Sequence, residues 1–136
     1  IDISSDNALL GVDGNATLSG NVGVHQFTTI GSYAFIGGLS RVLHDVPPYM
    51  LIEGNPSRPR CVNLVALRRN NFPREYIEAL SEAHRLLFRA KVGLDQACEI
   101  LRSQGHLVPP VNHLLNFVQE QQEGRFGRAR ERRQAA

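Results

Sequence analysis

Residues 12–42 read VDGNATLSGNVGVHQFTTIGSYAFIGGLSRV, and within this stretch an aliphatic residue recurs at every sixth position. The recurring residues are Val12, Leu18, Val24, Ile30, Ile36 and Val42. A period of six matches neither the 3.6-residue turn of an α-helix nor the strict alternation of a half-buried strand. It is typical of a chain that turns a corner after every six residues, so that three sides close a coil of about 18 residues. The period therefore predicts a parallel β-helix of the hexapeptide type.

A second set of small or β-branched residues follows the aliphatic set by four positions. Its members are Ala16, Val22, Thr28, Ala34 and Ser40. We expect the aliphatic residues to point into the prism and the small residues to fit beneath its corners.

Glycines are frequent in the same stretch, and we expect them to supply the permissive backbone that tight corners need. They are Gly11, Gly14, Gly20, Gly23, Gly31, Gly37 and Gly38. Short strands with irregular glycine turns, as in a small sandwich, would not hold one phase over this distance.

The repeat is short for a structure of this kind. Residues 7–46 make only about two coils, whereas stacked repeats generally need three or more to bury their apolar faces. We expect the open end to be covered by further coils before Ile1, by identical chains packed side by side, or by both. The chain begins with Ile1 and not with Met, which is what the latter part of a longer protein would show.

The period changes after Val42. The segment HDVPPYMLIEGNPSRPR, residues 44–60, contains four prolines and a glycine and ends the regular ladder. Beyond it the apolar spacing predicts four helices, over about 63–69, 73–90, 94–105 and 109–124, joined by short loops and packed antiparallel. We therefore expect a β-helix over 1–46, a proline-rich connection over 47–61, a helical domain over 62–124 and a basic tail over 125–136.

Composition excludes several classes of protein. The 136 residues are 42% hydrophobic and 21% charged, as in ordinary globular proteins, and carry a net charge of +2. The tail holds five of the arginines, so the body is slightly acidic and no nucleic-acid partner is expected. Cys61 and Cys98 lie far apart without metal-ligand spacing, which predicts no metal site and no disulfide scaffold and fits a cytoplasmic protein. No apolar run is long enough to span a membrane.

Specific motifs then point to one family. They are His25-Gln26-Phe27, Ile36-Gly37-Gly38, Asp45-Val46-Pro47-Pro48-Tyr49, Gly54-Asn55 and Asn63-Leu64. Together with the helical segment that follows them, they closely resemble the C-terminal half of the UDP-N-acetylglucosamine O-acyltransferases of lipid A biosynthesis. The resemblance runs without an obvious gap from about Val12 to about Val118.

The resemblance implies a fold and a reaction. Such enzymes are homotrimers of left-handed parallel β-helices, with active sites in the clefts between neighbouring prisms. They move a 3-hydroxyacyl chain from acyl carrier protein to the 3-hydroxyl of UDP-N-acetylglucosamine, without a cofactor. This transfer needs a base for the sugar hydroxyl and a hydrogen-bond donor for the oxygen of the tetrahedral intermediate.

The family's catalytic base does not fall within this chain. In ungapped register its position precedes Ile1, and a further family histidine near the cleft falls on Leu9. We therefore assign no catalytic residue. The chain is either the C-terminal part of a working enzyme, as the missing Met favours, or a shortened trimeric relative without activity, as Leu9 favours. The second alternative would keep only a nucleotide-binding or carrier-protein-binding surface.

Substrate-binding residues of the family can still be matched to positions in this chain. His25 and Gln26 match the pair that lines the family's cleft near the sugar and acyl chain, although His25 could instead cap a corner through backbone hydrogen bonds. Asn63 and Arg69 match residues that reach the nucleotide of the neighbouring chain. The guanidinium fork of an arginine suits a pyrophosphate because it forms charge-assisted, bidentate hydrogen bonds.

Three further positions leave alternatives open. The second residue of the family's basic pair is Asn70 here, and Arg68 stands one position before Arg69. Either the contacts to the phosphates are rearranged, or these two arginines are solvated charges at a helix end. Gly38 matches the position that gates acyl length, where it would leave room for a longer chain, unless the glycine serves only the backbone of a corner.

The remaining charged residues carry weaker signals. Arg68, Arg69, Arg85, Arg89 and Lys91 could steer an acidic carrier protein, or could form a solvated face. The spacing of His44, His84, His106 and His113 suggests neither a metal site nor a catalytic triad.

Overall fold

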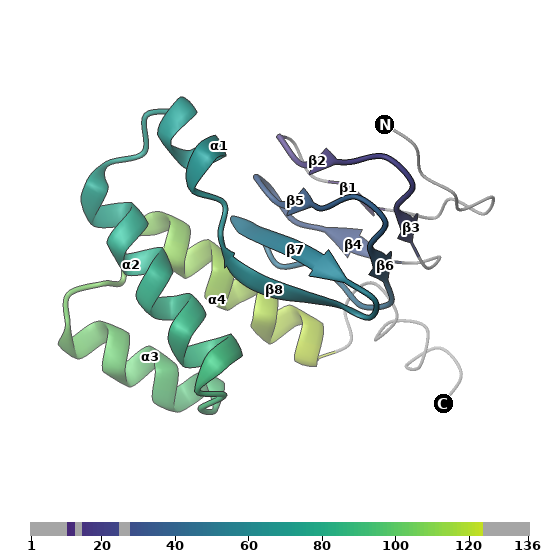
Figure 1. The fold of residues 1–136 in the computed structure, drawn as a ribbon. Coiled ribbons are helices and arrows are strands. Elements are labelled where there is room, and N and C mark those ends of the chain that lie inside the picture. Colours follow the sequence, from purple (N-terminus) through teal and green to yellow (C-terminus); the bar gives the residue numbers. More distant parts are fainter. Residues whose placement is uncertain (1–10, 13–14, 25–27, 124–136) are drawn as a thin grey trace.

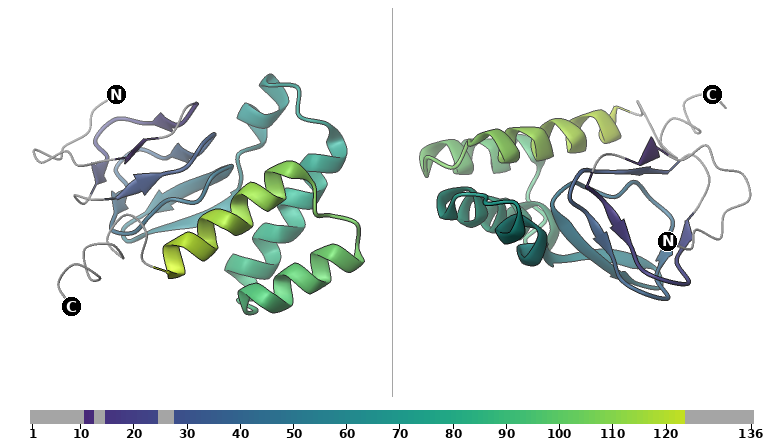
Figure 2. Two further views of the ribbon diagram at one scale, coloured as in Figure 1. Left: turned by 180° about the vertical axis from the view of Figure 1, so that it is seen from behind. Right: turned by 90° about the horizontal axis from the view of Figure 1, so that it is seen from above.

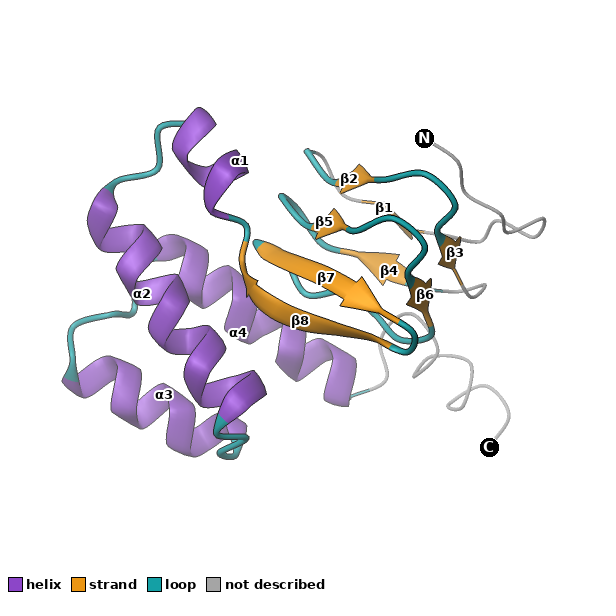
Figure 3. Cartoon of the chain, in the orientation of Figure 1, coloured by secondary structure: helices purple, strands orange, loops and turns teal. Residues whose placement is uncertain are grey.

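The computed structural model describes residues 11–12, 15–24 and 28–123. Short strands come first, then a hairpin, then helices (Figures 1 and 3). The strands are β1 (Gly11–Val12), β2 (Thr17–Leu18), β3 (Gly23–Val24), β4 (Thr29–Ile30), β5 (Phe35–Ile36), β6 (Arg41–Val42), β7 (Met50–Gly54) and β8 (Ser57–Val62). The helices are α1 (Leu64–Arg69), α2 (Arg74–His84), the π-helical turn η1 (Arg85–Arg89), α3 (Leu94–Ser103) and α4 (Pro109–Gln122).

The six short strands pair in parallel, each of the first three with the third strand after it. Gly11 pairs with Thr29, Thr17 with Phe35 and Gly23 with Arg41, so each turn of the chain advances by 18 positions. Three sheets result, in the orders β1-β4, β2-β5-β7-β8 and β3-β6. Figure 2 shows the strands on the sides of a three-sided coil. The period of six and the parallel pairing are confirmed, whereas the left-handed β-helix as such stays a prediction.

The last coil is shorter than the others and ends in a hairpin. Phe35 pairs with Leu51, and Ile30 forms a bridge with Val46, so this coil advances by 16 positions (from 35 to 51 and from 30 to 46). β7 then pairs antiparallel with β8. The reversal ends the parallel ladder and brings the chain to α1, as expected for the proline-rich segment.

The interior of the coil contains the aliphatic set. Leu18, Val24, Ile30, Ile36 and Val42 are all buried, and the side chain of Val12 lies outside the description. Val22, Thr28, Ala34 and Ser40 are buried as well, and Ala16 is half-buried. Both phases of the repeat therefore face inward, as the sequence predicts.

The prediction that glycines supply the permissive backbone of the corners is wrong for the described residues. Left-handed φ angles occur at Asn15, Asn21, Tyr33 and Leu39, which follow one another at intervals of six or twelve positions, and none of the described coil glycines has one. Each of these corner residues comes three positions after an aliphatic residue, and asparagine tolerates this conformation better than most residues. Gly31 is needed for another reason, because a Cβ there would lie 2.5 Å from the backbone nitrogen of Pro48.

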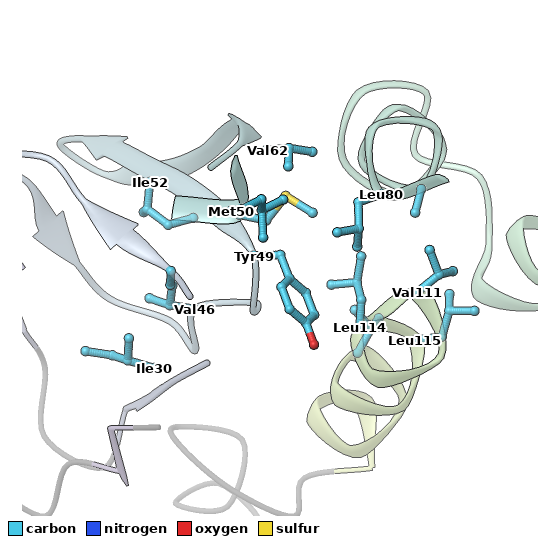
Figure 4. Close-up of a cluster of buried hydrophobic side chains, with 14 of the residues drawn as sticks. Ile30, Val46, Tyr49, Met50, Ile52, Val62, Leu80, Val111, Leu114 and Leu115 are labelled. Atoms are coloured by element: carbon cyan, nitrogen blue, oxygen red, sulfur yellow. The ribbon is translucent and has the colours of Figure 1, made fainter. Parts of the chain in front are cut away.

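The expected helices are confirmed within the described part of the chain, with η1 as an unpredicted addition. Asn63 caps α1, the two prolines at 109 and 110 begin α4, and Gly105, with φ of +74°, follows α3. α2 packs against β8, α3 and α4. Figure 4 shows Tyr49, Met50 and Val62 of the coil facing Leu80 of α2 and Val111, Leu114 and Leu115 of α4. One continuous hydrophobic core therefore joins coil and helices.

A cleft between the coil and the first helix

A cavity of about 560 Å³ lies between one side of the coil and α1. The coil contributes Asn15, Ala16, Thr17, Phe35 and Leu51, and the helix with its caps contributes Asn63, Val65, Ala66, Arg69 and Asn70. The structure thus brings Asn63 and Arg69, two of the predicted binding residues, to the same cavity. Arg68, the alternative phosphate ligand, is not among the lining residues.

The coil wall follows from strand geometry. Thr17, Phe35 and Leu51 occupy the same rung position on successive coils, because Thr17 pairs with Phe35 and Phe35 with Leu51. Each precedes a buried residue, and side chains alternate between the faces of a strand, so all three point outward. The wall is therefore a mostly apolar strip parallel to the axis of the coil.

Asn63 fixes the start of α1 to the coil. Its side chain is 6% exposed, its Nδ2 donates to the carbonyl oxygen of Tyr33 at 2.9 Å, and its Oδ1 accepts from the backbone N–H of Ala66 at 3.4 Å. Its own backbone N–H donates to the carbonyl oxygen of Tyr49 at 2.8 Å. The side chain therefore ties the helix cap to a coil corner, a role that the sequence analysis missed.

Arg69 is the cation of the cleft. It stands in the last turn of α1 and is exposed, and no ion pair joins it to another residue in the described ranges. Its neighbour Asn70 turns its side chain back to the helix, where Nδ2 donates to the carbonyl oxygen of Ala66 at 2.7 Å. The guanidinium group of Arg69 is thus available to an anion beside an apolar wall.

The other predicted site residues lie elsewhere. His25 and Gln26 fall outside the described residues. Gly38 is exposed at a corner and does not line the cleft. Its φ is not left-handed, and an added Cβ would make only ordinary contacts, 3.5 Å from the Gly20 carbonyl oxygen and 3.9 Å from Ser19 Cβ. The backbone therefore does not require glycine at this position.

A group of aromatic side chains holds the helices against one corner of the coil. Tyr33 and Tyr49 occupy equivalent corners on successive coils, and their rings stack at 5.9 Å with 13° between the planes. Phe72 meets both rings edge-on. The Tyr49 hydroxyl forms a hydrogen bond of 2.7 Å with Nδ1 of His113 on α4. Burial, and then the neighbouring Tyr33, raise the pKa of Tyr49 to about 12, so this phenol stays neutral.

A partial signal for this group is present in the sequence. Tyr49 ends the segment DVPPY and stands 16 positions after Tyr33, which is the advance of the shortened last coil. The length of that coil was not predictable, so the stacking of the two rings was not either.

None of the described histidines lines the cleft. His84 is buried, and its Nε2 lies 3.0 Å from the carbonyl oxygen of Pro59, so it faces β8. Within the described ranges no group of three or more metal-binding side chains is found. No helix among these residues has the length and apolar character needed to cross a bilayer.

Comparisons with known proteins agree on one family. The family model described as UDP N-acetylglucosamine O-acyltransferase, Domain 2, matches residues 45–126. An acyl-acyl-carrier-protein–UDP-N-acetylglucosamine O-acyltransferase of Synechocystis is 43% identical over 131 residues, which cover 92% of this chain and 47% of that protein. The corresponding enzyme of Myxococcus xanthus is 40% identical over 115 residues, covering 83% and 44%.

Solved structures show the same similarity. LpxA of Bacteroides fragilis, a UDP-N-acetylglucosamine acyltransferase, superposes with a TM-score of 0.75 at 29% identity, covering 81% of this chain and 43% of that one. The Arabidopsis UDP-N-acetylglucosamine acyltransferase gives 0.71 at 36% identity, covering 79% and 39%. The chain therefore spans less than half the length of these relatives.

Proposed function

The chain belongs to the UDP-N-acetylglucosamine O-acyltransferase family, and we propose that it is the C-terminal part of an enzyme that transfers a 3-hydroxyacyl chain from acyl carrier protein to the 3-hydroxyl of UDP-N-acetylglucosamine. The observation that carries this proposal is the 43% identity to a transferase of this name over 92% of the chain. The reaction belongs to lipid A biosynthesis. The relatives described above are all named as acyltransferases, which gives the shortened non-catalytic alternative no support.

The proposed architecture is a homotrimer of left-handed parallel β-helices. Parallel strands that advance by 18 positions and the likeness to LpxA support the β-helix (positions 11 to 29, 17 to 35 and 23 to 41). In this proposal the helical domain over 62–124 follows the coil through the connection over 47–61, and the tail over 125–136 is separate. Free thiols at Cys61 and Cys98 fit a cytoplasmic location.

The cleft between the coil and α1 would take the nucleotide end of the acceptor. Arg69 is its exposed cation, and a guanidinium group forms bidentate hydrogen bonds with phosphate oxygens. Asn63 would mainly position α1, because its amide already donates a hydrogen bond to the Tyr33 carbonyl oxygen. The apolar strip of Phe35 and Leu51 would shield these contacts from water and so strengthen them.

The other substrate contacts remain proposals from the family register. His25 and Gln26 would line the cleft between neighbouring copies near the sugar and the acyl chain. Gly38 would leave room at the position that limits acyl length. No described residue is assigned as the base, so the proton of the sugar hydroxyl would pass to a residue outside this chain's described ranges.

Calorimetric titration of the full chain with UDP-N-acetylglucosamine and with its 3-O-acylated product tests the proposal. A hydrogen bond to a charged group contributes about 1.5–3 kcal/mol, so Arg69→Ala should weaken binding of both ligands by roughly 10-fold to 100-fold. Arg74→Ala is the control, because Arg74 is exposed on α2 and pairs with Glu78 at 3.0 Å. Unaltered binding by Arg69→Ala would show that this residue does not bind the nucleotide. Absence of binding by the wild-type chain would contradict the assignment of the cleft as the nucleotide site.

A further inference from the structure

A second cavity, of about 790 Å³, lies between β8 and the π-helical turn η1. It shares no lining residue with the cleft beside α1. Its most prominent members are four cations, Arg58 and Arg60 from β8 and Arg89 and Lys91 from the end of η1 and the turn after it. These residues come from segments about 30 positions apart in the chain, so the fold and not the local sequence brings the charges together.

The positive charge of this cavity is poorly balanced. Arg60 lies 3.8 Å from Glu53, which is not among the lining residues. In the described part of the chain no ion pair involves Arg58, Arg89 or Lys91. Two exposed arginines of the helical domain do have acidic partners, since Arg74 pairs with Glu78 and Arg102 with Glu99, whereas Arg68 and Arg69 form no ion pair with a described residue. Like charges at close range repel, and an anion bound between them would relieve this repulsion.

A hydrogen bond joins the two walls of the cavity, and a ring contact orients one lining residue. Nε2 of the buried His84 hydrogen-bonds with the carbonyl oxygen of Pro59, which stands between the two arginines of β8. The ring of Phe88, a lining residue, lies 5.6 Å from the His84 ring. The π-helical turn contributes as well, because its extra residue changes the direction of the side chains that follow, and such turns are frequent at functional sites.

The turn after η1 directs a further cation to the cavity. Lys91 has a φ of 54°, a conformation that favours glycine at this place after a helix. The backbone N–H of Val92 then donates to the carbonyl oxygen of Leu86 at 3.0 Å, which fixes the turn. A lysine at a position where glycine would be easier is consistent with a use for its charge.

The lining also contains an apolar portion. Leu87, Phe88 and Val92 line the cavity and are only partly buried. On β8, Arg58 and Arg60 both line the cavity, and Arg60 lies at a register shift where the strand has one residue more than β7. Guanidinium forks bind phosphate oxygens in pairs, and several cations favour a dianion over a singly charged carboxylate. We propose that this cavity binds a phosphate monoester that carries a compact apolar group.

The probe for this proposal is phenyl phosphate, titrated calorimetrically into the full chain near physiological ionic strength. Inorganic phosphate tests the anion alone, and benzyl alcohol tests the apolar group alone. We expect one phenyl phosphate per chain, bound about tenfold more tightly than inorganic phosphate, because only phenyl phosphate buries apolar surface against Phe88. Benzyl alcohol should not bind measurably.

Matched substitutions locate the site. Arg58→Gln and Arg89→Gln should each weaken phenyl phosphate binding by about tenfold or more. Arg74→Gln makes the same change of charge at an exposed site on α2 and should change the affinity less than about twofold. Arg69→Ala, which tests the nucleotide cleft, should also leave it unaltered, so the two proposals can fail separately.

Each contrary result overturns the proposal. No binding at about 10 mM phenyl phosphate would exclude a useful site. Equal weakening by Arg58→Gln and Arg74→Gln would show a general charge effect. Equal affinity for phenyl and inorganic phosphate would exclude the apolar contribution. Circular dichroism of each variant should match that of the wild-type chain, and Arg58→Lys, which keeps the charge, provides a second measurement if Arg58→Gln does not fold.

Discussion

The hydroxyl of Tyr49 lies 2.7 Å from Nδ1 of His113, although 64 positions separate the two residues in the chain. Tyr49 occupies a corner of the last coil, directly before β7, and His113 lies in the first half of α4. Their hydrogen bond, with the ring of Phe72 packed edge-on against Tyr49, joins the coil to the helical region. The position of α1 beside the cleft depends on the same corner, because Asn63 is bonded to the carbonyl oxygens of both Tyr33 and Tyr49.

Removal of this hydroxyl should destabilise the fold. Tyr49→Phe keeps the ring contacts and deletes the hydrogen bond, leaving a partly buried nitrogen of His113 without its partner. We expect a loss of about 1–2 kcal/mol in the free energy of unfolding, measured by urea denaturation. Tyr76→Phe is the control, since the Tyr76 hydroxyl makes no hydrogen bond with a described residue. A similar loss for both variants would mean that the bond to His113 contributes nothing specific.

The same phenol predicts a loss of stability in alkali. Its pKa in the folded chain is about 12, raised from the usual 10.0 by burial and by Tyr33. At pH values below 10 the phenol is neutral in both states. Between pH 10 and 12 the unfolded chain releases this proton while the folded chain retains it, so the free energy of unfolding falls as pH rises.

Tyrosinate absorbance measures this effect directly. The chain has three tyrosines, and one of them should titrate late in the folded state. Tyr49→Phe should remove that late step and flatten the decline in stability over the same pH range. A late step that persists in the variant would assign the raised pKa to another tyrosine.

The coil was predictable because its signal is periodic and local. An aliphatic residue at every sixth position sets which side chains face inward, and Ile30 and Ile36 are indeed fully buried. The helix bounds were predictable to within a few residues for a similar reason, since apolar spacing, prolines and Gly105 mark them.

Features that depend on contacts between distant segments were not predictable. Both the shortening of the last coil and the π-helical turn arise where two segments must fit together, and neither leaves a pattern in the sequence. Ligand binding by Asn63 stays a prediction from the family register, and the hydrogen bond of its amide to the Tyr33 carbonyl oxygen was not predictable. The cation cluster around Arg58 and Arg89 was missed because its members come from separate elements.

Asn63 offers a test of how the cleft is held. Asn63→Ala removes both the cap of α1 and the donor to the Tyr33 carbonyl oxygen, in a residue that is 6% exposed. We expect a loss of about 2–3 kcal/mol, more than for a cap alone. Asn70→Ala, at the exposed other end of α1, should cost less than about 1 kcal/mol. Equal costs, measured by thermal and urea unfolding, would show that the tie to the coil is unimportant.

Substitution by alanine should have opposite effects at two glycines of the coil. In Gly31→Ala the new methyl group would lie 2.5 Å from the nitrogen and 2.8 Å from the Cα of Pro48, and these backbone atoms cannot move without shifting the last coil. We expect a loss of about 1–3 kcal/mol or a change in the coil. At Gly20 an added Cβ meets nothing within 4 Å, and its φ is not left-handed.

Gly20→Ala should therefore be neutral or stabilise the chain by up to about 1 kcal/mol, because alanine restricts the unfolded state more than glycine does. Paired urea unfolding curves of the two variants give the comparison. If corners of the coil required glycine for its backbone freedom, both substitutions would be costly. The structure instead places the left-handed conformation at residues such as Asn21 and Leu39, so only the glycine in close contact with Pro48 should resist replacement.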